Sequence, residues 1–178
     1  MRKLFVTLLS AILLVGAPAQ AERDNVPDYI SAAVPAAELV GQSRMSYLMW
    51  DVYDAAFFRS SRHENLHPPY ALSLTYLRSI TGRQIADSAI EEMRKHGFTQ
   101  EIILAEWHNM MVDLFPDVGT GTQLTGIATA DGATLFYHDG RFIGQVNDAS
   151  FTARFFDIWL GPQTSDVAFR NRLLGRGS

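Results

Sequence analysis

The sequence contains no cysteine, which excludes disulfide bonds, thiolate catalysis, thiolate metal ligands and a lipid anchor on an N-terminal cysteine. The chain must therefore be held together by packing and hydrogen bonds. Basic residues are also few, since 15 Lys and Arg stand against 19 Asp and Glu, and the formal net charge is −4. A general nucleic-acid binder normally carries a basic surface, so we expect no nucleic-acid partner.

Long apolar runs are scarce as well, and the one that stands out is at the N-terminus. Arg2 and Lys3 precede a mainly apolar run over residues 4–16, and residues 17–21 read A-P-A-Q-A. This pattern is typical of a secretory signal peptide cleaved after Ala21. The run is shorter than the roughly 20 apolar residues that span a bilayer, although an uncleaved anchor is the alternative. We expect a periplasmic or secreted protein with no transmembrane segment after cleavage.

Cleavage after Ala21 would leave 178 − 21 = 157 residues, enough for one domain with its own core. Loss of Arg2 and Lys3 would leave 13 basic residues against 19 acidic ones, a net charge of −6. Residues 22–37 contain two prolines and several alanines, which predicts a flexible leader. The predicted organisation is a signal peptide over 1–21, a leader over 22–37 and one domain over 38–178; the oligomeric state is not indicated.

Several segments have the composition of β-strands. Residues 39–58 are rich in apolar and aromatic side chains and predict two strands or one long bent strand. Residues 59–69 are polar and end in two prolines, which predicts a loop, and the alternation over 70–78 predicts a half-buried strand. Asp-Gly pairs, which are strong hairpin signals, separate three more short strands, expected at 123–129, 133–138 and 141–146.

Helices are predicted between and after these strands. Thr81 and Gln84 form an S/T-x-x-Q capping box, and apolar residues recur at helical spacing up to Gly97, where we expect the helix to end. Strand segments joined by hairpins, together with helices, predict the α+β class, an antiparallel sheet with helices packed on one face. Further helices are expected over 99–114, over 151–160 after a cap at Asp148, and in a short stretch after Pro162.

Motifs for metal and nucleophilic chemistry are weak. Residues 63–67 read H-E-N-L-H and satisfy H-E-x-x-H, but they lie in a predicted loop before two prolines, whereas a zinc site of this kind needs a helix. Glu92 and His96 are four residues apart and could share a metal, although a surface contact is the expected interpretation. The segment 119–122 reads G-T-G-T and lacks the lysine of a phosphate loop, and no G-x-S-x-G is present. We expect no metal and no cofactor.

A family resemblance gives a more specific expectation. Five segments are similar, in the same order, to the bacterial chalcone isomerase-like family, and the resemblance covers roughly residues 36–176. It implies an open-faced β-sandwich with a large antiparallel sheet, a layer of helices and a smaller strand layer. The segments are 50–55 (WDVYDA), 81–93 (TGRQIADSAIEEM), 137–140 (YHDG), 155–161 (FFDIWLG) and 173–175 (LLG).

The same resemblance implies that the isomerase reaction has been lost. Plant chalcone isomerases add a phenolate oxygen to an enone, which needs a cation for the phenolate and hydroxyl donors for the ketone. Matched residue by residue, the donor positions here hold alkyl or acidic groups, and Arg44 could replace the plant arginine only if the loop differs. The matching positions are 35–37 for the arginine, Leu48 for a threonine, Ile85 for a tyrosine, Glu92 for an asparagine, and Asp157 or Ile158 for a serine or threonine.

These observations favour an exported, non-catalytic protein that binds a small apolar or carboxylate-bearing ligand, because plant relatives without isomerase activity bind fatty acids. Arg44, Tyr76 and Arg78 are the candidates for the polar end of the site, and Tyr47, Met49 and Trp107 for its walls. One alternative is an isomerase or lyase that uses Glu92 as a general base, which requires a buried carboxyl with a raised pKa. Another is a structural protein with a filled core.

Overall fold

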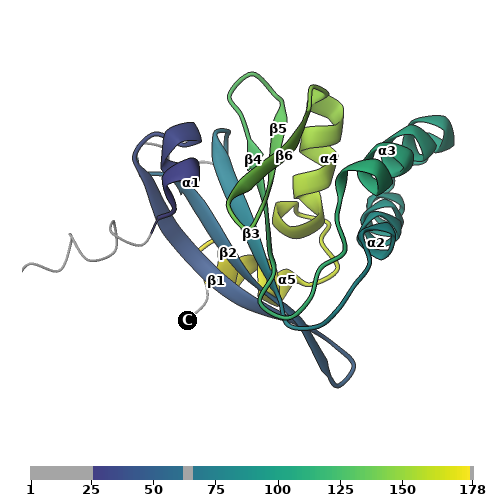
Figure 1. Cartoon of the computed structure of the whole chain (residues 1–178), viewed down its shortest axis with the longest axis horizontal. Coiled ribbons are helices and arrows are strands. Elements are labelled where there is room, and N and C mark those ends of the chain that lie inside the picture. Colours follow the sequence, from purple (N-terminus) through teal and green to yellow (C-terminus); the bar gives the residue numbers. More distant parts are fainter. Residues whose placement is uncertain (1–25, 62–65, 177–178) are drawn as a thin grey trace, which may run out of the picture.

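The computed structural model describes residues 26–61 and 66–176, and its centre is one six-stranded antiparallel sheet (Figure 1). The strands cross the sheet in chain order, which confirms the predicted α+β class. The predicted signal peptide lies outside the described residues. The strands are β1 (Ala37–Tyr47), β2 (Trp50–Ser60), β3 (Tyr70–Tyr76), β4 (Gln123–Ala128), β5 (Thr134–His138) and β6 (Arg141–Val146).

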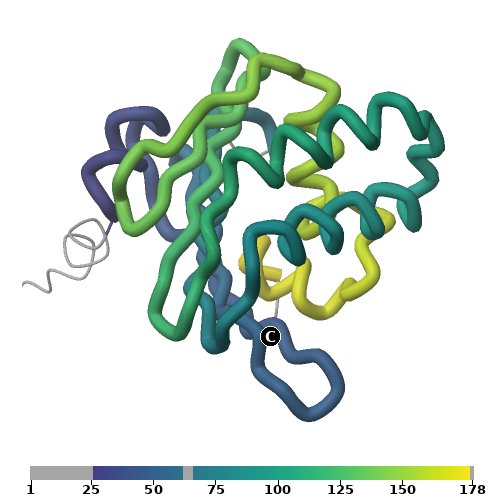
Figure 2. The backbone as a smooth tube through the Cα atoms, turned by 45° about the vertical axis from the view of Figure 1, so that its right-hand side comes forward, coloured from purple at the N-terminus to yellow at the C-terminus, as the bar shows by residue number. Residues whose placement is uncertain are grey.

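Within residues 26–61 and 66–176 five helices accompany the sheet, and none of these combines the length and apolarity needed to cross a bilayer. Helices α2, α3 and α4 lie on one side of the sheet, and α1 lies on the other (Figures 1 and 2). Helix α5 packs against β1 and β2 near the C-terminus. The helices are α1 (Asp28–Ala33), α2 (Gly82–Lys95), α3 (Glu101–Leu114), α4 (Ala149–Leu160) and α5 (Val167–Leu173).

Local sequence signals explain several of these boundaries. Thr81 Oγ1 accepts a hydrogen bond from the Gln84 amide at 3.2 Å, and the Gln84 side chain accepts one from the Thr81 amide at 2.9 Å, so the predicted capping box is confirmed. Asp139 and Gly140 both have positive φ (47° and 76°), the geometry of a type I′ turn between β5 and β6. Residues 39–58 form two strands, β1 and β2, rather than one bent strand.

The core between the sheet and helices α2–α4 is rich in aromatic side chains. Tyr70, Leu72, Leu74 and Tyr76 of β3 all face it and are buried. Phe156 of α4 meets the Tyr70 ring edge to face, and the rings from α4, β5 and the end of α3 contact one another largely in the same way, which adds directional contacts to apolar burial. The participating rings include Phe115, Phe136, Phe151, Phe155 and Phe156.

Helix α1 covers part of the opposite face of the sheet, so the prediction of a flexible leader over 22–37 is wrong for residues 28–34. Ile30 and Val34 are fully buried against Phe58, Ala71 and Ile127. This cover, together with the helix layer, buries β3 on both faces, so the prediction of a half-buried strand is also wrong. Within the described residues there is one sheet, so the smaller strand layer that the resemblance implied is not found among them.

Candidate ligand-binding cavity

A cavity of ≈170 Å³ lies in the core, between the helix-covered face of the sheet and helices α2 and α4. Its walls are mainly aromatic and aliphatic and come from β2, β3, β4, β5, α2, α4 and the segments beside them. The cavity is partly open to solvent, so it is a pocket that a ligand can enter rather than a sealed void in the core. The apolar wall residues include Leu72, Leu74, Ile80, Ile85, Ala89, Phe115, Leu124, Phe136, Phe155, Phe156 and Ile158.

Helix α2 supplies the polar part of the cavity wall. Gln84, Ser88 and Glu92 all line the cavity. They are spaced four residues apart, and this spacing places them along one stripe of the helix. The next stripe carries Ile85 and Ala89, so α2 presents a polar edge beside an apolar one.

Two tyrosines add hydroxyl groups. Tyr53 of β2 and Tyr76 of β3 are register partners, and their rings meet edge to face at 5.8 Å. Tyr53 Oη accepts a hydrogen bond from Trp159 Nε1 at 2.9 Å, and burial raises the pKa of Tyr53 to about 12. Burial also raises the pKa of Tyr76, and no group in the described part of the chain makes a hydrogen bond with its hydroxyl. Both are therefore neutral phenols at physiological pH, and the Tyr76 hydroxyl is available to a ligand.

Glu92 is held as a paired carboxylate. Lys95 Nζ donates to its Oε1 and Ser165 Oγ donates to its Oε2, each at 2.9 Å, and the side chain is 21% exposed. Burial opposes ionisation, but the hydrogen bonds from Lys95 and Ser165 outweigh it and hold the pKa of Glu92 below its usual value. A general base for an isomerase or lyase needs the opposite shift, so this geometry does not meet the condition for the enzymatic alternative.

His96 lies beside this carboxylate and is more buried than the sequence suggested. Its side chain is 7% exposed, and Nε2 lies 3.8 Å from Glu92 Oε2 without a hydrogen-bond partner. The expected contact between Glu92 and His96 is therefore present, but it is partly buried. Within residues 26–61 and 66–176 no group of three or more His, Asp or Glu side chains could hold a metal ion. Residues 63–65 of the H-E-x-x-H motif lie outside the described part of the chain.

Of the residues that the sequence suggested for a ligand site, Tyr76 and Glu92 line the cavity. Trp107 instead belongs to the packed core, where it stacks on Phe98 and its Nε1 donates to Asp148 Oδ2 at 3.0 Å. The other four candidates, Arg44, Tyr47, Met49 and Arg78, are exposed. Tyr47 and Met49 are exposed because residues 47–49 form the end of the β1–β2 hairpin. Tyr47 and Met49 are 70% and 91% exposed, and the exposed Arg78 lies over the Trp50 ring at 5.8 Å.

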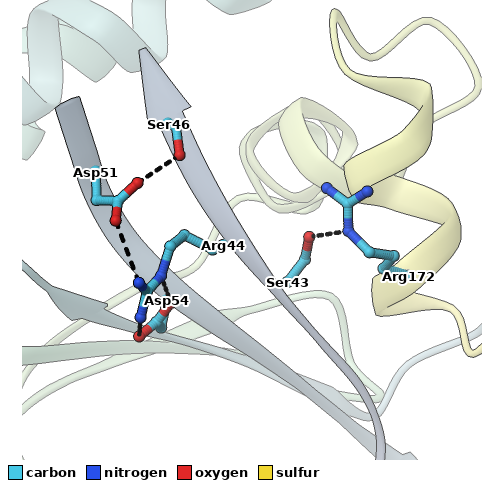
Figure 3. Close-up of polar contacts among 6 residues, drawn as sticks. All are labelled: Ser43, Arg44, Ser46, Asp51, Asp54 and Arg172. Carbon is cyan, nitrogen blue, oxygen red and sulfur yellow. Dashed lines mark hydrogen bonds and ion pairs between the residues drawn. The ribbon is translucent and has the colours of Figure 1, made fainter. Parts of the chain in front are cut away.

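Arg44 is on the wrong face of the sheet for a ligand in this cavity. Its neighbour Ser43 points toward the helix side, where Arg172 of α5 donates to Ser43 Oγ at 2.8 Å, so Arg44 points the other way (Figure 3). The guanidinium is bound to Asp54 at 2.7 and 2.8 Å and to Asp51 at 3.1 Å. Arg44 is therefore neutralised as well as misplaced, and it is not the polar end of the site.

The cavity is also lined by Tyr53, Ser88 and Trp159, which were not predicted from the sequence. Strand alternation over β2 and β3 was the available signal, since it places Tyr53 on the same face as Tyr76 once the register is known. The spacing of Ser88 between Gln84 and Glu92 was also visible. What the sequence did not provide was the pairing of β2 with β3.

Comparison with known proteins agrees with this architecture. A family model described as chalcone isomerase-like matches residues 24–175. The chain belongs to the chalcone isomerase-like family. A protein from Haemophilus influenzae that carries no functional description is 27% identical over 142 residues, covering 77% of this chain and 67% of that protein. A crystal structure of an Arabidopsis thaliana fatty-acid binding protein shares the fold with a TM-score of 0.62 and 12% identity, covering 80% of this chain and 90% of the other.

The chalcone isomerase-like fold brings only some of the matched catalytic positions to the cavity. Ile85, Glu92 and Ile158 line it, and none of the three supplies a neutral hydroxyl donor. Leu48 is 84% exposed at the end of the β1–β2 hairpin, with φ of 56°. Asp157 lies outside the lining, and burial raises the pKa of its carboxyl. Four hydroxyl-bearing residues line this cavity in the described part of the chain, Tyr53, Tyr76, Ser88 and Thr125, and the Thr125 hydroxyl is already hydrogen-bonded to Tyr29 and Ser73.

Proposed function

We propose that this chalcone isomerase-like protein is exported and binds a small, uncharged, apolar molecule in the cavity, without catalysing its conversion. The observation that carries the proposal is the cavity of ≈170 Å³ between the sheet and helices α2 and α4. An empty apolar cavity lowers the stability of a protein, because its lining loses both burial and dispersion contacts. A ligand of matching shape recovers these contacts and is bound for that reason.

The volume indicates the size of the ligand. An apolar cavity of about 150 Å³ holds a molecule of the size of benzene, whereas pockets for drug-sized ligands have volumes of about 300–1,000 Å³. The cavity therefore fits a single ring or a short chain. A long acyl chain would require α2 or α4 to move away from the sheet.

The charge of the lining favours an uncharged ligand over a carboxylate. Among the described residues that line the cavity there is no Lys, Arg or His, and the one charged side chain is Glu92, which is already paired with Lys95 outside the lining. A fatty acid would bring a second negative charge close to Glu92 in a poorly solvated site, which is unfavourable. The Arabidopsis fatty-acid binding protein supports an apolar ligand on this fold, while the charge of this chain favours an alcohol, a phenol or another neutral hydrogen-bonding group.

The absence of catalysis is supported by the same lining. Ile85 cannot donate a hydrogen bond to a ketone, and the lowered pKa of Glu92 makes it a weaker base than an ordinary carboxylate. We expect no conversion of chalcones to flavanones when the purified protein is assayed by absorbance. Turnover that is lost in Glu92→Gln would instead support the isomerase or lyase.

Export is proposed from residues 1–21 of the sequence. N-terminal sequencing of the protein recovered from its natural host is expected to begin at Glu22, in the periplasmic or secreted fraction. A chain in the cytosolic fraction that still begins at residue 1 would contradict this part of the proposal.

Ligand binding is tested by isothermal titration with matched pairs small enough for the cavity, benzyl alcohol against benzoate and butanol against butanoate. We expect the alcohol to bind more tightly than the acid in each pair. Ala89 is 6% exposed and lines the cavity, so Ala89→Leu should fill the space and weaken binding about tenfold or more. Ala105 is on the exposed face of α3, and Ala105→Leu is the control that should leave affinity unchanged. Equal affinity in both variants would overturn the assignment of the cavity.

A further inference from the structure

The end of the β1–β2 hairpin carries a compact group of exposed apolar side chains. Tyr47, Leu48, Met49 and Trp50 are consecutive, and they are 70%, 84%, 91% and 63% exposed. The hairpin extends beyond the rest of the sheet, so these residues, which we call the hairpin tip, project from the body of the protein (Figures 1 and 2). Single exposed apolar residues are common on protein surfaces, but four in a row at a projecting turn indicate a contact.

The side chains of the hairpin change in polarity along its length. Leu48 and Met49 form the apex, and directly behind them Tyr47 and Trp50 are paired across the two strands. Tyr and Trp combine an apolar ring with one polar group, and they are enriched where hydrocarbon meets water in membranes. Charged and polar groups, including Arg44 and Asp51, come next. The order from apex to base is therefore apolar, amphipathic and charged, as in a half-bilayer from its interior to water.

Polar contacts behind the tip hold the hairpin in shape. Ser46 Oγ donates to Asp51 Oδ1 at 2.6 Å, and Arg44 bridges Asp51 and Asp54 (Figure 3). Arg78 lies over the Trp50 ring at 5.8 Å. These contacts pair residues on both strands close to the turn, so the apolar apex is presented by a preformed element and little ordering is needed on contact.

We propose that the hairpin tip inserts its apolar apex into the surface of a lipid bilayer. A bilayer suits this tip better than a protein partner, because its exposed side chains stand at the end of a narrow projecting turn and follow the apolar, amphipathic and charged order of a half-bilayer. The net charge of −4, and the two aspartates paired with Arg44, give no attraction to anionic lipid. The contact is therefore apolar, and its strength should depend little on salt.

Vesicle flotation tests the proposal with the purified protein and phosphatidylcholine vesicles. We expect the wild-type protein to float with the vesicles at low and high salt. Leu48→Ser with Met49→Ser should lower the partition coefficient on the order of 10-fold or more, because the two apical side chains no longer transfer into hydrocarbon. The control is Ile102→Ser with Val167→Ser, which removes two exposed apolar side chains elsewhere (79% and 57% exposed) and should leave partitioning within about twofold.

Tryptophan fluorescence reports on the same event directly. Trp50 is 63% exposed, whereas Trp107 and Trp159, the other two tryptophans, are 5% and 9% exposed. Brominated phosphatidylcholine should therefore quench mainly Trp50 in the wild-type protein, and the quenching should be lost in Trp50→Phe.

Three outcomes would overturn the proposal. The first is no partitioning at millimolar lipid, and the second is partitioning that the Leu48→Ser and Met49→Ser changes do not affect. The third is a wild-type oligomer, measured by light scattering, that becomes a monomer when the tip is changed. The last outcome would show that the tip contacts a second copy of the chain instead. The test does not depend on the cavity or its ligand.

Discussion

Tyr53 and Tyr76 show how one residue type takes two roles on neighbouring strands. Both are buried and line the cavity, and their rings are in contact. The Tyr53 hydroxyl accepts the hydrogen bond of the Trp159 indole, so it satisfies a polar group in the core. The Tyr76 hydroxyl makes no hydrogen bond with the described residues, so it is the group that we expect to contact a ligand.

The same substitution should therefore affect mainly stability at Tyr53 and mainly ligand binding at Tyr76. Tyr53→Phe leaves Trp159 Nε1 without its acceptor and should lower the free energy of unfolding by about 1–2 kcal/mol. Tyr76→Phe should change it by less than about 0.5 kcal/mol, but should weaken the binding of an alcohol about 2–10-fold. Urea unfolding and calorimetric titration of both variants measure the two effects. Equal losses of stability would contradict these roles.

Glu92 and Asp157 are predicted to respond to pH in opposite directions. The pKa of Glu92 is lowered in the folded protein, so its contribution to stability is present above the unfolded pKa and is lost as pH falls through the folded pKa. The pKa of Asp157 is raised by burial, so its charged form destabilises the fold, and stability is lost as pH rises through the folded pKa.

Neutral variants separate the two cases. At pH 7, Glu92→Gln should lower the free energy of unfolding by about 1 kcal/mol or less, because Glu92 remains partly in water. Asp157→Asn should raise it by a few tenths of a kcal/mol. Both differences should shrink toward zero near pH 3, where the carboxyls are protonated in the unfolded chain. Denaturant titrations at pH 3, 5 and 7 measure them, and a loss of stability for both variants at pH 7 would be the contrary result.

Among the helices and strands, those with strong sequence signals close to their own ends were predicted correctly. Helix α2 was predicted from its capping box and the β4–β6 meander from its Asp-Gly turns, because these signals act within a few residues. Helix α1 was missed, although Ile30 and Val34 have helical spacing. A helix of six residues is stable only through tertiary packing, here against Phe58 and Ile127, and that contact is not local.

The candidate site was harder to predict than the fold for the same physical reason. The apolar run over residues 47–50 resembles a buried strand in composition, and only the pairing of Tyr47 with Trp50 shows that a turn exposes it. Arg44 was assigned to the site because it is near the matched tyrosine in sequence, but alternation of strand faces turns it away. The site depends on register and on which face each helix covers, and both are tertiary properties.

The docking of α1 gives a prediction at this scale. Ile30 is fully buried against the sheet, so Ile30→Ala should lower the free energy of unfolding by about 2–4 kcal/mol. Ser31 is adjacent and exposed, and Ser31→Ala should change it by less than about 0.5 kcal/mol. Chemical unfolding of the two variants measures the difference. If Ile30→Ala were as stable as Ser31→Ala, residues 28–34 would be the loose leader that the sequence suggested.

Across the whole molecule, the two faces of the sheet and its projecting end differ in polarity and exposure. One face, under α2 and α4, forms a wall of the apolar cavity, and the other is partly covered by α1 and carries the Arg44–Asp54 ion pair. The hairpin tip extends from the end of the sheet (Figure 2). A protein that holds a small apolar molecule and touches a bilayer would be placed where such molecules partition, so the two proposals are compatible although each is tested separately.

The occupied cavity is the central claim, and native mass spectrometry of the protein purified from its natural host tests it most directly. The account predicts a bound small molecule on the wild-type and Ala105→Leu proteins and its loss from Ala89→Leu, since that side chain fills the cavity. Solvent extraction followed by mass spectrometry of the extract should identify the molecule as uncharged and no larger than a single ring or a short chain. A wild-type protein of unliganded mass, or an adduct retained equally by Ala89→Leu, would contradict the account.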